Sequence, residues 1–421
     1  MENPNKKQKL IAFIAVIVIA VILTIIITTN VVNNQMQNGE YGATANSNSN
    51  LVANVIKKGI TIGGITGTLE NLDTSDATAT AEDILWGKTG YVKGEKITGT
   101  KVNTVALGKE SQKVFDENTT LIDDYGNKVE VPAGFKIASD SATAVTGGVV
   151  IEDASAGNNY TQGSQFVWIP VGTIKTNNNG GTATITLGRY VFDDNGNPNC
   201  VQLGQNYANE TELRVRSTDS FYYKELLNTT ESVNTKAKNI GTFTTNTIKA
   251  GGYYFGRYEA GDATGVQRNN TTSDTNPVAI KKSLWPYNWI TEAQASERAG
   301  NMYSSDSFTS DLANSYAWDT AIAFIQAVQD SDYSMQECTQ RELAKCGETI
   351  NSNENANDVR CNIYDMAGNT YEWTTETIYG SGDQYVNRGS GYTVVNTTQG
   401  RSSNTNGASS ASRCFRVILY L

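Results

Sequence analysis

An unbroken apolar run near the N-terminus is the strongest constraint on how this 421-residue chain folds. Residues Leu10–Ile27 read LIAFIAVIVIAVILTIII, and Thr24 is their only polar member. A helix needs about 20 such residues to cross the hydrocarbon core of a membrane. The run therefore predicts a transmembrane helix over residues 10–28, and residues 1–30 are expected to form a short tail and membrane anchor.

The charges beside this run predict its orientation. Lys6, Lys7 and Lys9 precede it, whereas Thr28–Asn30 follow without charge. Positive residues stay on the cytoplasmic side, so we expect a single-pass protein with a cytoplasmic N-terminus and an extracellular C-terminal head. A cleaved signal peptide and a type IV prepilin remain alternatives. Against them, no Ala-x-Ala step follows the run, and the glycine of a prepilin start is missing.

An internal repeat follows a linker rich in Asn, Ser and Gly over residues 31–50, which we expect to be flexible. Within residues 51–103, Ala53–Thr68 parallels Ala81–Thr100, and both copies end in Ile-Thr-Gly-Thr. Each copy predicts one helical turn and then two brief strands joined at a glycine. The second copy resembles short repeats in tail and surface proteins of Gram-positive phages and bacteria. Such small units are typical of a stalk or docking collar.

From residue 104 onward, short β-rich runs alternate with long polar loops. The runs predict strands at Lys128–Val131, Gly147–Ile151, Gln165–Val171, Ala183–Phe192 and Tyr253–Tyr258. Apolar residues at helical spacing predict a core-facing helix over Tyr316–Gln329 and a weaker one over Thr291–Met302. Short strands with few helices indicate an α+β domain over residues 104–421.

Composition excludes several kinds of chemistry. The chain has no histidine, which rules out Ser-His-Asp and Cys-His relays, His-ligated zinc and the two-His iron site. Its net charge of −10 argues against a nucleic-acid partner. The cysteines are too few for a disulfide framework: Cys200, Cys338, Cys346, Cys361 and Cys414. Cys338 and Cys346 either form a disulfide or remain buried thiols.

Three motifs near the C-terminus carry a family resemblance. They are Asn362–Trp373 (NIYDMAGNTYEW), Asn387–Tyr392 (NRGSGY) and Arg413–Val417 (RCFRV). Together with upstream Phe166–Pro170, Tyr254–Glu259 and Ala317–Phe324, they resemble the formylglycine-generating enzyme, or sulfatase-modifying-factor, family. The resemblance implies a C-type-lectin-like fold for residues 104–421. That family shares the fold with the variable proteins of diversity-generating retroelements.

The DMAGNTYEW segment is a candidate calcium site. Asp365 and Glu372 bracket a Gly-Asn turn, and hard oxygen ligands on a tight turn suit Ca²⁺. The resemblance implies a structural calcium held by the side chains of Asp365 and Glu372 and the carbonyls of Gly368 and Thr370. One alternative is a turn capped by Asp365, with Glu372 paired to an arginine. Another is that the two carboxylates are a glycosidase acid and nucleophile.

The catalytic cysteines of the family are missing. The resemblance implies that an active oxidase carries two cysteines, with four residues between them, in the loop between the RGGS-like turn and the final strand, where they bind copper. The corresponding segment, Gly389–Arg413, contains none, and Cys414 lies just beyond it. Related iron-dependent enzymes of this fold use histidines, which this chain lacks. We therefore expect no copper site, and a head without catalytic residues.

The polar segment before the final strand is the candidate ligand-binding region. It is built mainly from Ser, Thr, Asn, Gly and Val, which suits adaptable hydrogen bonding, with Tyr and Arg as anchors. The residues predicted to bind the ligand are Tyr385, Asn387, Tyr392, Asn396, Gln399, Arg401, Asn404 and Asn406. The alternative is an ordinary polar surface loop.

The sequence as a whole predicts a membrane-anchored extracellular protein, adhesin- or receptor-like. Its head is expected to bind a glycan or protein ligand through residues 385–413, with calcium stabilising the fold. Two other functions stay open. One is an oxidase of the formylglycine-generating type that modifies cysteine in sulfatases. The other is a structural surface protein of a phage or pilus.

Overall fold

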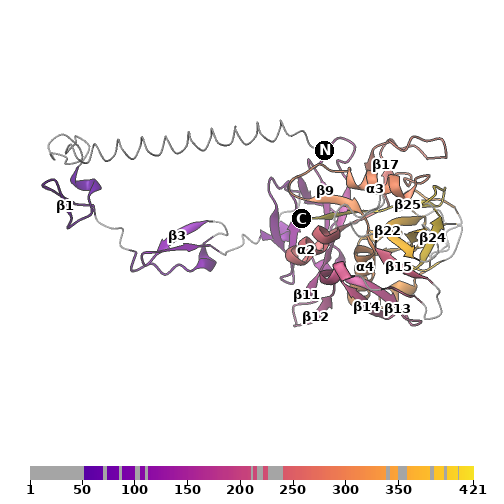
Figure 1. Ribbon diagram of the computed structural model, residues 1–421, viewed down its shortest axis with the longest axis horizontal. Helices are drawn as coiled ribbons and strands as arrows, with labels where there is room; N and C mark the ends of the chain where they lie inside the picture. Colours follow the sequence, from indigo (N-terminus) through magenta and orange to yellow (C-terminus); the bar gives the residue numbers. More distant parts are fainter. Residues whose placement is uncertain are drawn as a thin grey trace, which may run out of the picture. The chain divides into compact units, whose positions relative to one another are not determined.

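The computed structural model divides the chain into two units, Met1–Lys101 and Val102–Leu421 (Figure 1). It describes residues 52–69, 74–84, 88–99, 105–109, 112–209, 212–215, 221–225, 240–337, 342–348, 358–379, 384–392, 396–405 and 407–421. The predicted membrane helix and the linker over 31–50 lie outside these ranges. Within them, no helix is both long and apolar enough to cross a membrane.

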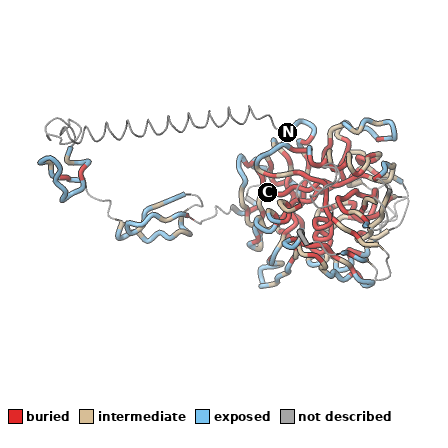
Figure 2. Tube along the Cα trace, viewed as in Figure 1, coloured by how far each residue is buried: buried red, intermediate tan, exposed pale blue. Residues whose placement is uncertain are grey.

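The described part of the first unit contains the two predicted repeats, and each is a helical turn followed by a hairpin. The elements are η1 (Ala53–Val55), β1 (Thr61–Ile62), β2 (Ile65–Thr66), η2 (Ala81–Asp83), β3 (Thr89–Val92) and β4 (Glu95–Thr98). Gly64 and Gly94 occupy the turns with φ of 81° and 82°, where a side chain would be strained. Most described residues of this unit are exposed, in contrast to the red interior of the second unit (Figure 2).

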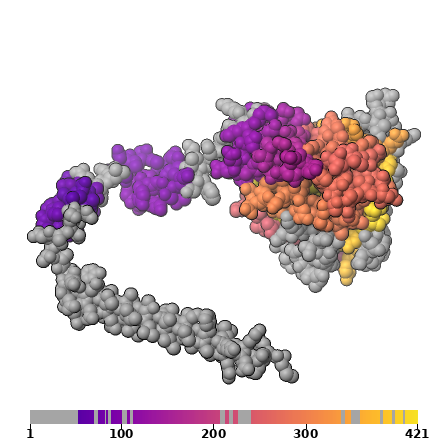
Figure 3. Space-filling view, turned by 90° about the horizontal axis from the view of Figure 1, so that it is seen from above, coloured from indigo at the N-terminus to yellow at the C-terminus, as the bar shows by residue number. Residues whose placement is uncertain are grey.

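The second unit, the head, is built around a six-stranded antiparallel sheet. Its strands are, in spatial order, β19 (Thr309–Leu312), β26 (Val417–Tyr420), β16 (Gly252–Gly256), β10 (Gln165–Pro170), β9 (Val150–Asp153) and β8 (Phe135–Ile137). The central strands QFVWIP and GYYFG are almost continuously apolar because both faces of the sheet are covered. In Figure 3, residues from the start of the head, in purple, lie beside residues from later in the chain, in orange.

A second sheet carries the C-terminal motifs. Its antiparallel strands are β15 (Tyr222–Glu225), β22 (Tyr371–Tyr379), β23 (Gln384–Arg388) and β24 (Arg401–Thr405), and β25 (Arg413–Phe415) pairs with β22 in parallel. Two extra residues bulge from β22 between Trp373 and Thr377. A bulge strengthens local twist, which bends this strand across the sheet.

Three α-helices lie in the described part of the head: α2 (Ile240–Ala250), α3 (Glu292–Gly300) and α4 (Ser315–Val328). The helix predicted over Tyr316–Gln329 is confirmed as α4, which Asn314 caps by accepting from the backbone N–H of Ala317. The weaker helix is confirmed as α3, which Thr291 caps. Every residue of α4 from Ser315 to Ile325 is buried, so its apolar stripe packs in the core as expected.

Small sheets of two or three strands complete the head. They are β5 (Val105–Ala106) with β6 (Thr119–Ile122) and β7 (Lys128–Val131), β11 (Gly172–Lys175) with β12 (Thr182–Ile185), β13 (Gly188–Phe192) with β14 (Pro198–Leu203), β17 (Gly261–Asp262) with β18 (Val278–Ala279), and β20 (Val359–Arg360) with β21 (Ile363–Tyr364). The strand predicted over Ala183–Phe192 is wrong as one element, because β12 ends at Ile185 and a separate hairpin begins with β13 at Gly188. The head is thus mostly sheet with few helices.

Candidate ligand-binding site

The second sheet has one buried and one partly exposed face. On β15, Tyr223 and Glu225 are buried, whereas Tyr222 and Lys224 retain solvent exposure. On β22, Ile378 is buried between more exposed neighbours. Successive side chains of a strand point to opposite faces, so this alternation assigns each residue to a face. We call the face that carries Tyr222 and Lys224 the outer face.

The strand register shows which other residues share the outer face. Tyr379 lies directly opposite Tyr222, and Thr377 lies directly opposite Lys224. Thr377 is in turn opposite Tyr385 on β23, which is opposite Asn404 on β24. Directly opposed residues project to the same side. The outer face therefore gathers aromatic rings, hydroxyls, amides and one lysine from four strands.

Two tyrosines form an aromatic platform at one end of the outer face. The ring centroids of Tyr222 and Tyr379 are 5.0 Å apart and their planes are inclined by 37°. Tyr379 is 58% exposed, which is unusual for a large ring in a sheet this well packed. The Nζ of Lys224 lies 5.8 Å from the centroid of Tyr379, and the guanidinium of Arg214 lies 5.8 Å from that of Tyr222. Cations and ring faces attract one another at such distances.

A buried charge network lies beneath the opposite face. Arg401 donates to Asp319 of α4 across 2.6 Å and to Glu376 of β22 across 3.0 Å. Arg388 donates to the other oxygen of Asp319 across 2.6 Å, and Arg189 of β13 donates to Glu376 across 2.8 Å. These five side chains are at most 3% exposed. The network ties β22, β23 and β24 to α4 and holds the outer face rigid from behind.

The charges of this network decide the protonation of Glu376. Burial would raise the pKa of its carboxyl, but the guanidiniums of Arg401, Arg189 and Arg388 outweigh burial and lower that pKa to about 2. The pKa of neighbouring Glu225 shifts in the opposite direction, because burial and the charge of Glu376 raise the pKa of its carboxyl. One carboxylate is thus held ionised while the other is pushed toward its neutral form.

The other end of the outer face contains unsatisfied polar groups. Asn387 lies two residues beyond Tyr385 on β23 and opposite Trp373, whose indole donates to the carbonyl of Ile290. Both amide atoms of Asn387 and both carboxylate oxygens of Glu292 are buried without a hydrogen-bond partner. Burial raises the pKa of the Glu292 carboxyl well above its ordinary value, and Glu225 raises it further. Protein groups bury this end of the outer face, whereas the end that carries Tyr222 and Tyr379 is exposed to solvent.

Gly407 allows the backbone to cover Glu292 at the buried end of the outer face. A Cβ at this position would lie 2.9 Å from the Cβ of Glu292 and 3.2 Å from the ring of Tyr385. Its φ of 57° is also one that side chains rarely adopt. Because Gly407 has no side chain, the backbone can pass between α3 and β23 and cover Glu292.

The structure brings only part of the predicted ligand-binding set together. Tyr385, Asn387 and Asn404 share the outer face. Arg401 does not, and the expectation that it anchors a ligand at the surface is wrong, because its guanidinium is 3% exposed and held by two carboxylates. Asn387 is also buried rather than presented to solvent. The difference follows from strand parity, which puts Arg401 opposite Arg388 on the inward side.

The remaining predicted residues lie in or beyond the loop after β23. Asn396 donates to the carbonyl of Gly389 and Gln399 donates to the sulfur of Met335, so both side chains bond within the protein. Tyr392 is half-buried. Asn406 lies outside the described residues. Sequence reasoning missed Tyr222, Lys224, Thr377 and Tyr379, although the alternation in YYKE and TETIY was a usable signal.

The side chains expected to hold calcium are engaged with protein groups. Arg416 donates to both oxygens of Glu372, at 2.5 and 2.8 Å, and an oxygen of Asp365 accepts from the N–H of Gly347 at 2.7 Å. No group of three or more acidic, cysteine or histidine side chains suited to a metal occurs among the described residues. The contacts of Glu372 thus match the alternative in which an arginine pairs with it, and the side chains of Glu372 and Asp365 both have protein partners. The calcium site stays a prediction.

The turn is also braced by Glu259, which sequence reasoning did not assign. Its carboxylate accepts from the N–H and hydroxyl of Thr370 and from the amide of Asn369. Asp365 and Asn369 both have positive φ, which asparagine and aspartate tolerate better than most residues. The motif therefore has a structural role independent of any metal.

The described cysteines are free thiols, and none is activated. Burial raises the pKa of the Cys414 thiol well above its ordinary value, and Glu259 and Glu372 raise it further. Cys346 is a second buried thiol, and its charge would raise the pKa of Cys414. Burial raises the pKa of the Cys346 thiol as well. A soft-metal site requires thiolates, which these surroundings disfavour. Cys338 lies outside the described residues, whereas Cys346 is not in a disulfide.

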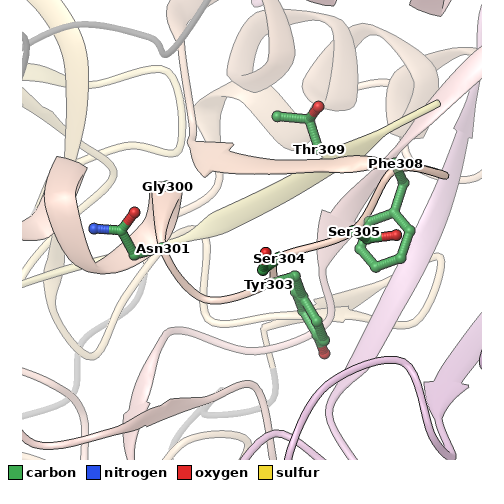
Figure 4. Close-up of a pocket in the computed structure, with 7 residues that line it drawn as sticks. All are labelled: Gly300, Asn301, Tyr303, Ser304, Ser305, Phe308 and Thr309. Carbon is green, nitrogen blue, oxygen red and sulfur yellow. The ribbon is translucent and has the colours of Figure 1, made fainter.

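A small surface cavity of about 210 Å³ lies in the turn between α3 and β19 (Figure 4). Its lining is polar and uncharged, with Gly300, Asn301, Tyr303–Ser305, Phe308 and Thr309. Tyr303 is the one titratable residue in it, and its hydroxyl donates to Asp153 at 3.1 Å. No carboxylate, thiol or cationic side chain lines this cavity.

Comparisons with known proteins add little to this picture. No family model matches the sequence, and no curated protein matches it. Among solved structures, CarF is similar over 40% of this chain and 87% of its own, with 15% identity and a TM-score of 0.28. Treponema denticola variable protein 1 is similar over 61% of this chain and 96% of its own, with 11% identity and a TM-score of 0.29. At these TM-scores neither similarity supports a conclusion about function.

Proposed function

We propose that this protein is a non-catalytic, ligand-binding protein of the cell surface, anchored through residues 10–28 with its C-terminal head outside. The head takes a glycan or protein ligand on the outer face of its second sheet. The observation that carries this proposal is the exposed Tyr222–Tyr379 platform, which continues through Thr377 toward Tyr385. Exposed aromatic rings beside hydrogen-bonding groups are typical of binding surfaces.

Rigidity of the face supports the same function. The buried pairs of Arg401 and Arg388 with Asp319 fix the strands that carry the outer-face residues. A preorganised surface loses less conformational entropy when a ligand binds. Burial raises the pKa of the Cys346 and Cys414 thiols, which gives no support to the oxidase alternative.

A binding screen tests the proposal. The full-length chain is screened against glycans and cell-surface proteins, and each ligand found is measured again with Tyr379→Ala and Tyr222→Ala. Tyr160→Ala is the matched control, because Tyr160 is an exposed tyrosine elsewhere on the head. We expect both outer-face variants to weaken binding and the control to match the wild type. Equal binding by all three variants would contradict the proposal.

A further inference from the structure

We infer that the ligand of the outer face is an acidic saccharide, whose sugar ring stacks on Tyr222 and Tyr379 while its carboxylate pairs with Lys224. This inference deepens the proposed function and depends on it. The two tyrosines provide the surface on which a sugar ring stacks, and the charge of the lysine selects sugars that carry a carboxylate.

The platform suits a sugar ring. Two rings 5.0 Å apart and inclined by 37° form a shallow apolar surface rather than a closed pocket. One side of a pyranose ring presents mainly C–H groups, which pack on aromatic faces, while its hydroxyls point outward around the rim. The phenol groups of both tyrosines can also exchange hydrogen bonds with those hydroxyls.

Lys224 is available to a ligand. Its Nζ lies over Tyr379 at 5.8 Å from the ring centroid, and no carboxylate pairs with it among the described residues. Arg214 at the other side of the platform differs, because Glu212 accepts from it at 3.2 Å. The backbone of Lys224 is fixed by the hydroxyl of Thr377, which donates to its carbonyl at 3.2 Å. An ammonium held beside a stacking surface is complementary to a sugar carboxylate.

The surroundings favour a sugar over other anions. Apart from Arg214 and Glu212, which pair with each other beside Tyr222, the outer face next to the platform carries uncharged hydrogen-bonding side chains, Thr377 on β22 and Asn404 on β24, which suit sugar hydroxyls. A polyanion such as a nucleic acid needs a row of cations. This face offers one unpaired lysine in the described region, and the chain carries a net charge of −10. A single carboxylate on a polyhydroxylated ligand therefore fits best.

The test compares acidic oligosaccharides with their carboxyl-reduced, neutral analogues on the full-length chain by calorimetry. Oligosaccharides ending in a uronic or a sialic acid are used as probes. We expect Lys224→Met to weaken binding of the acidic probe about tenfold and to leave the neutral analogue unchanged, since one charged contact contributes on that scale. Tyr379→Ala is expected to weaken both. Lys249→Met, a change at an exposed lysine of α2, is the matched control.

Several outcomes overturn the inference. They are equal binding of acidic and neutral probes by the wild type, no binding of any acidic probe, and unchanged binding by Lys224→Met. A preference for polyphosphate or nucleic acid also overturns it. If Tyr379→Ala still weakens some other ligand, the proposed function survives and only the ligand class is wrong. Equal melting temperatures of the variants show that the fold is intact.

Discussion

Arg401 of β24 donates to Asp319 of α4 across 2.6 Å, although the two residues lie 82 positions apart. The pair joins the C-terminal sheet to the most deeply buried helix of the head. Glu376 accepts from the same guanidinium at 3.0 Å, so one arginine satisfies carboxylates from two different elements. The outer face is therefore displayed on strands that are anchored from beneath.

Replacing Arg401 with Met is expected to destabilise the head strongly. The change leaves Asp319 and Glu376 with fewer donors in a buried site, and breaking such a pair costs about 3–5 kcal/mol. Urea unfolding gives the free energy. Arg298→Met is the control, because its pair with Glu297 is partly exposed and should contribute at most about 1 kcal/mol. Similar losses in the two variants would contradict the structural role of the network.

Replacing Glu292 with Gln is expected to change how stability depends on pH. Burial raises the pKa of this carboxyl in the folded state, so the stability it contributes is complete below its unfolded pKa of about 4.3 and is lost as pH rises. Glutamine does not titrate. The free energy of unfolding of Glu292→Gln, relative to that of the wild type, should therefore increase as pH rises from about 4.5 to 8.

The measurement is the free energy of unfolding of both proteins across that range. Glu297→Gln serves as the control on the same helix, because its side chain is partly exposed. A constant difference between Glu292→Gln and the wild type would show that Glu292 is solvated.

The thiol of Cys414 is expected to resist alkylation in the native protein. It is fully buried and its pKa is raised, whereas Cys200 is only half-buried. Mass spectrometry of peptides after timed alkylation should find Cys200 modified first and Cys414 only after unfolding. Rapid modification of Cys414, together with uptake of Cu(I), would favour the oxidase alternative instead.

The predicted calcium site makes stability depend on metal. If calcium binds the DMAGNTYEW turn, the melting temperature should fall in excess chelator and recover on addition of Ca²⁺, and Asp365→Asn should abolish this dependence. The same melting temperature with chelator and with calcium would refute the site. In that case the bond from Arg416 to Glu372 stiffens the turn without a metal.

Much of the fold could be predicted from local pattern. The helical repeat of Trp318, Ile322 and Ile325 predicted α4 to within a residue at each end. The repeats predicted the two hairpins of the first unit, because glycine turns and short β-rich runs act over a few residues. Each of these signals lies within one element.

The candidate site could be predicted only in part. The loop composition selected Tyr385 and Asn404, which lie on the outer face, but it also selected Arg401, which faces inward. The segment RSSNT has no apolar alternation that would reveal which side of the sheet each residue takes. The partners Tyr222 and Tyr379 lie on strands far apart in the sequence, and their meeting depends on register.

The amino-acid sequence by itself determined α4, the hairpins of the two repeats and the absence of histidine chemistry. These follow from residue type and from spacing within one segment. Only the tertiary structure decided which side chains reach solvent and which are buried as ion pairs. The physical reason is that a strand assigns its residues to opposite faces, and pairing with distant strands decides which face is covered.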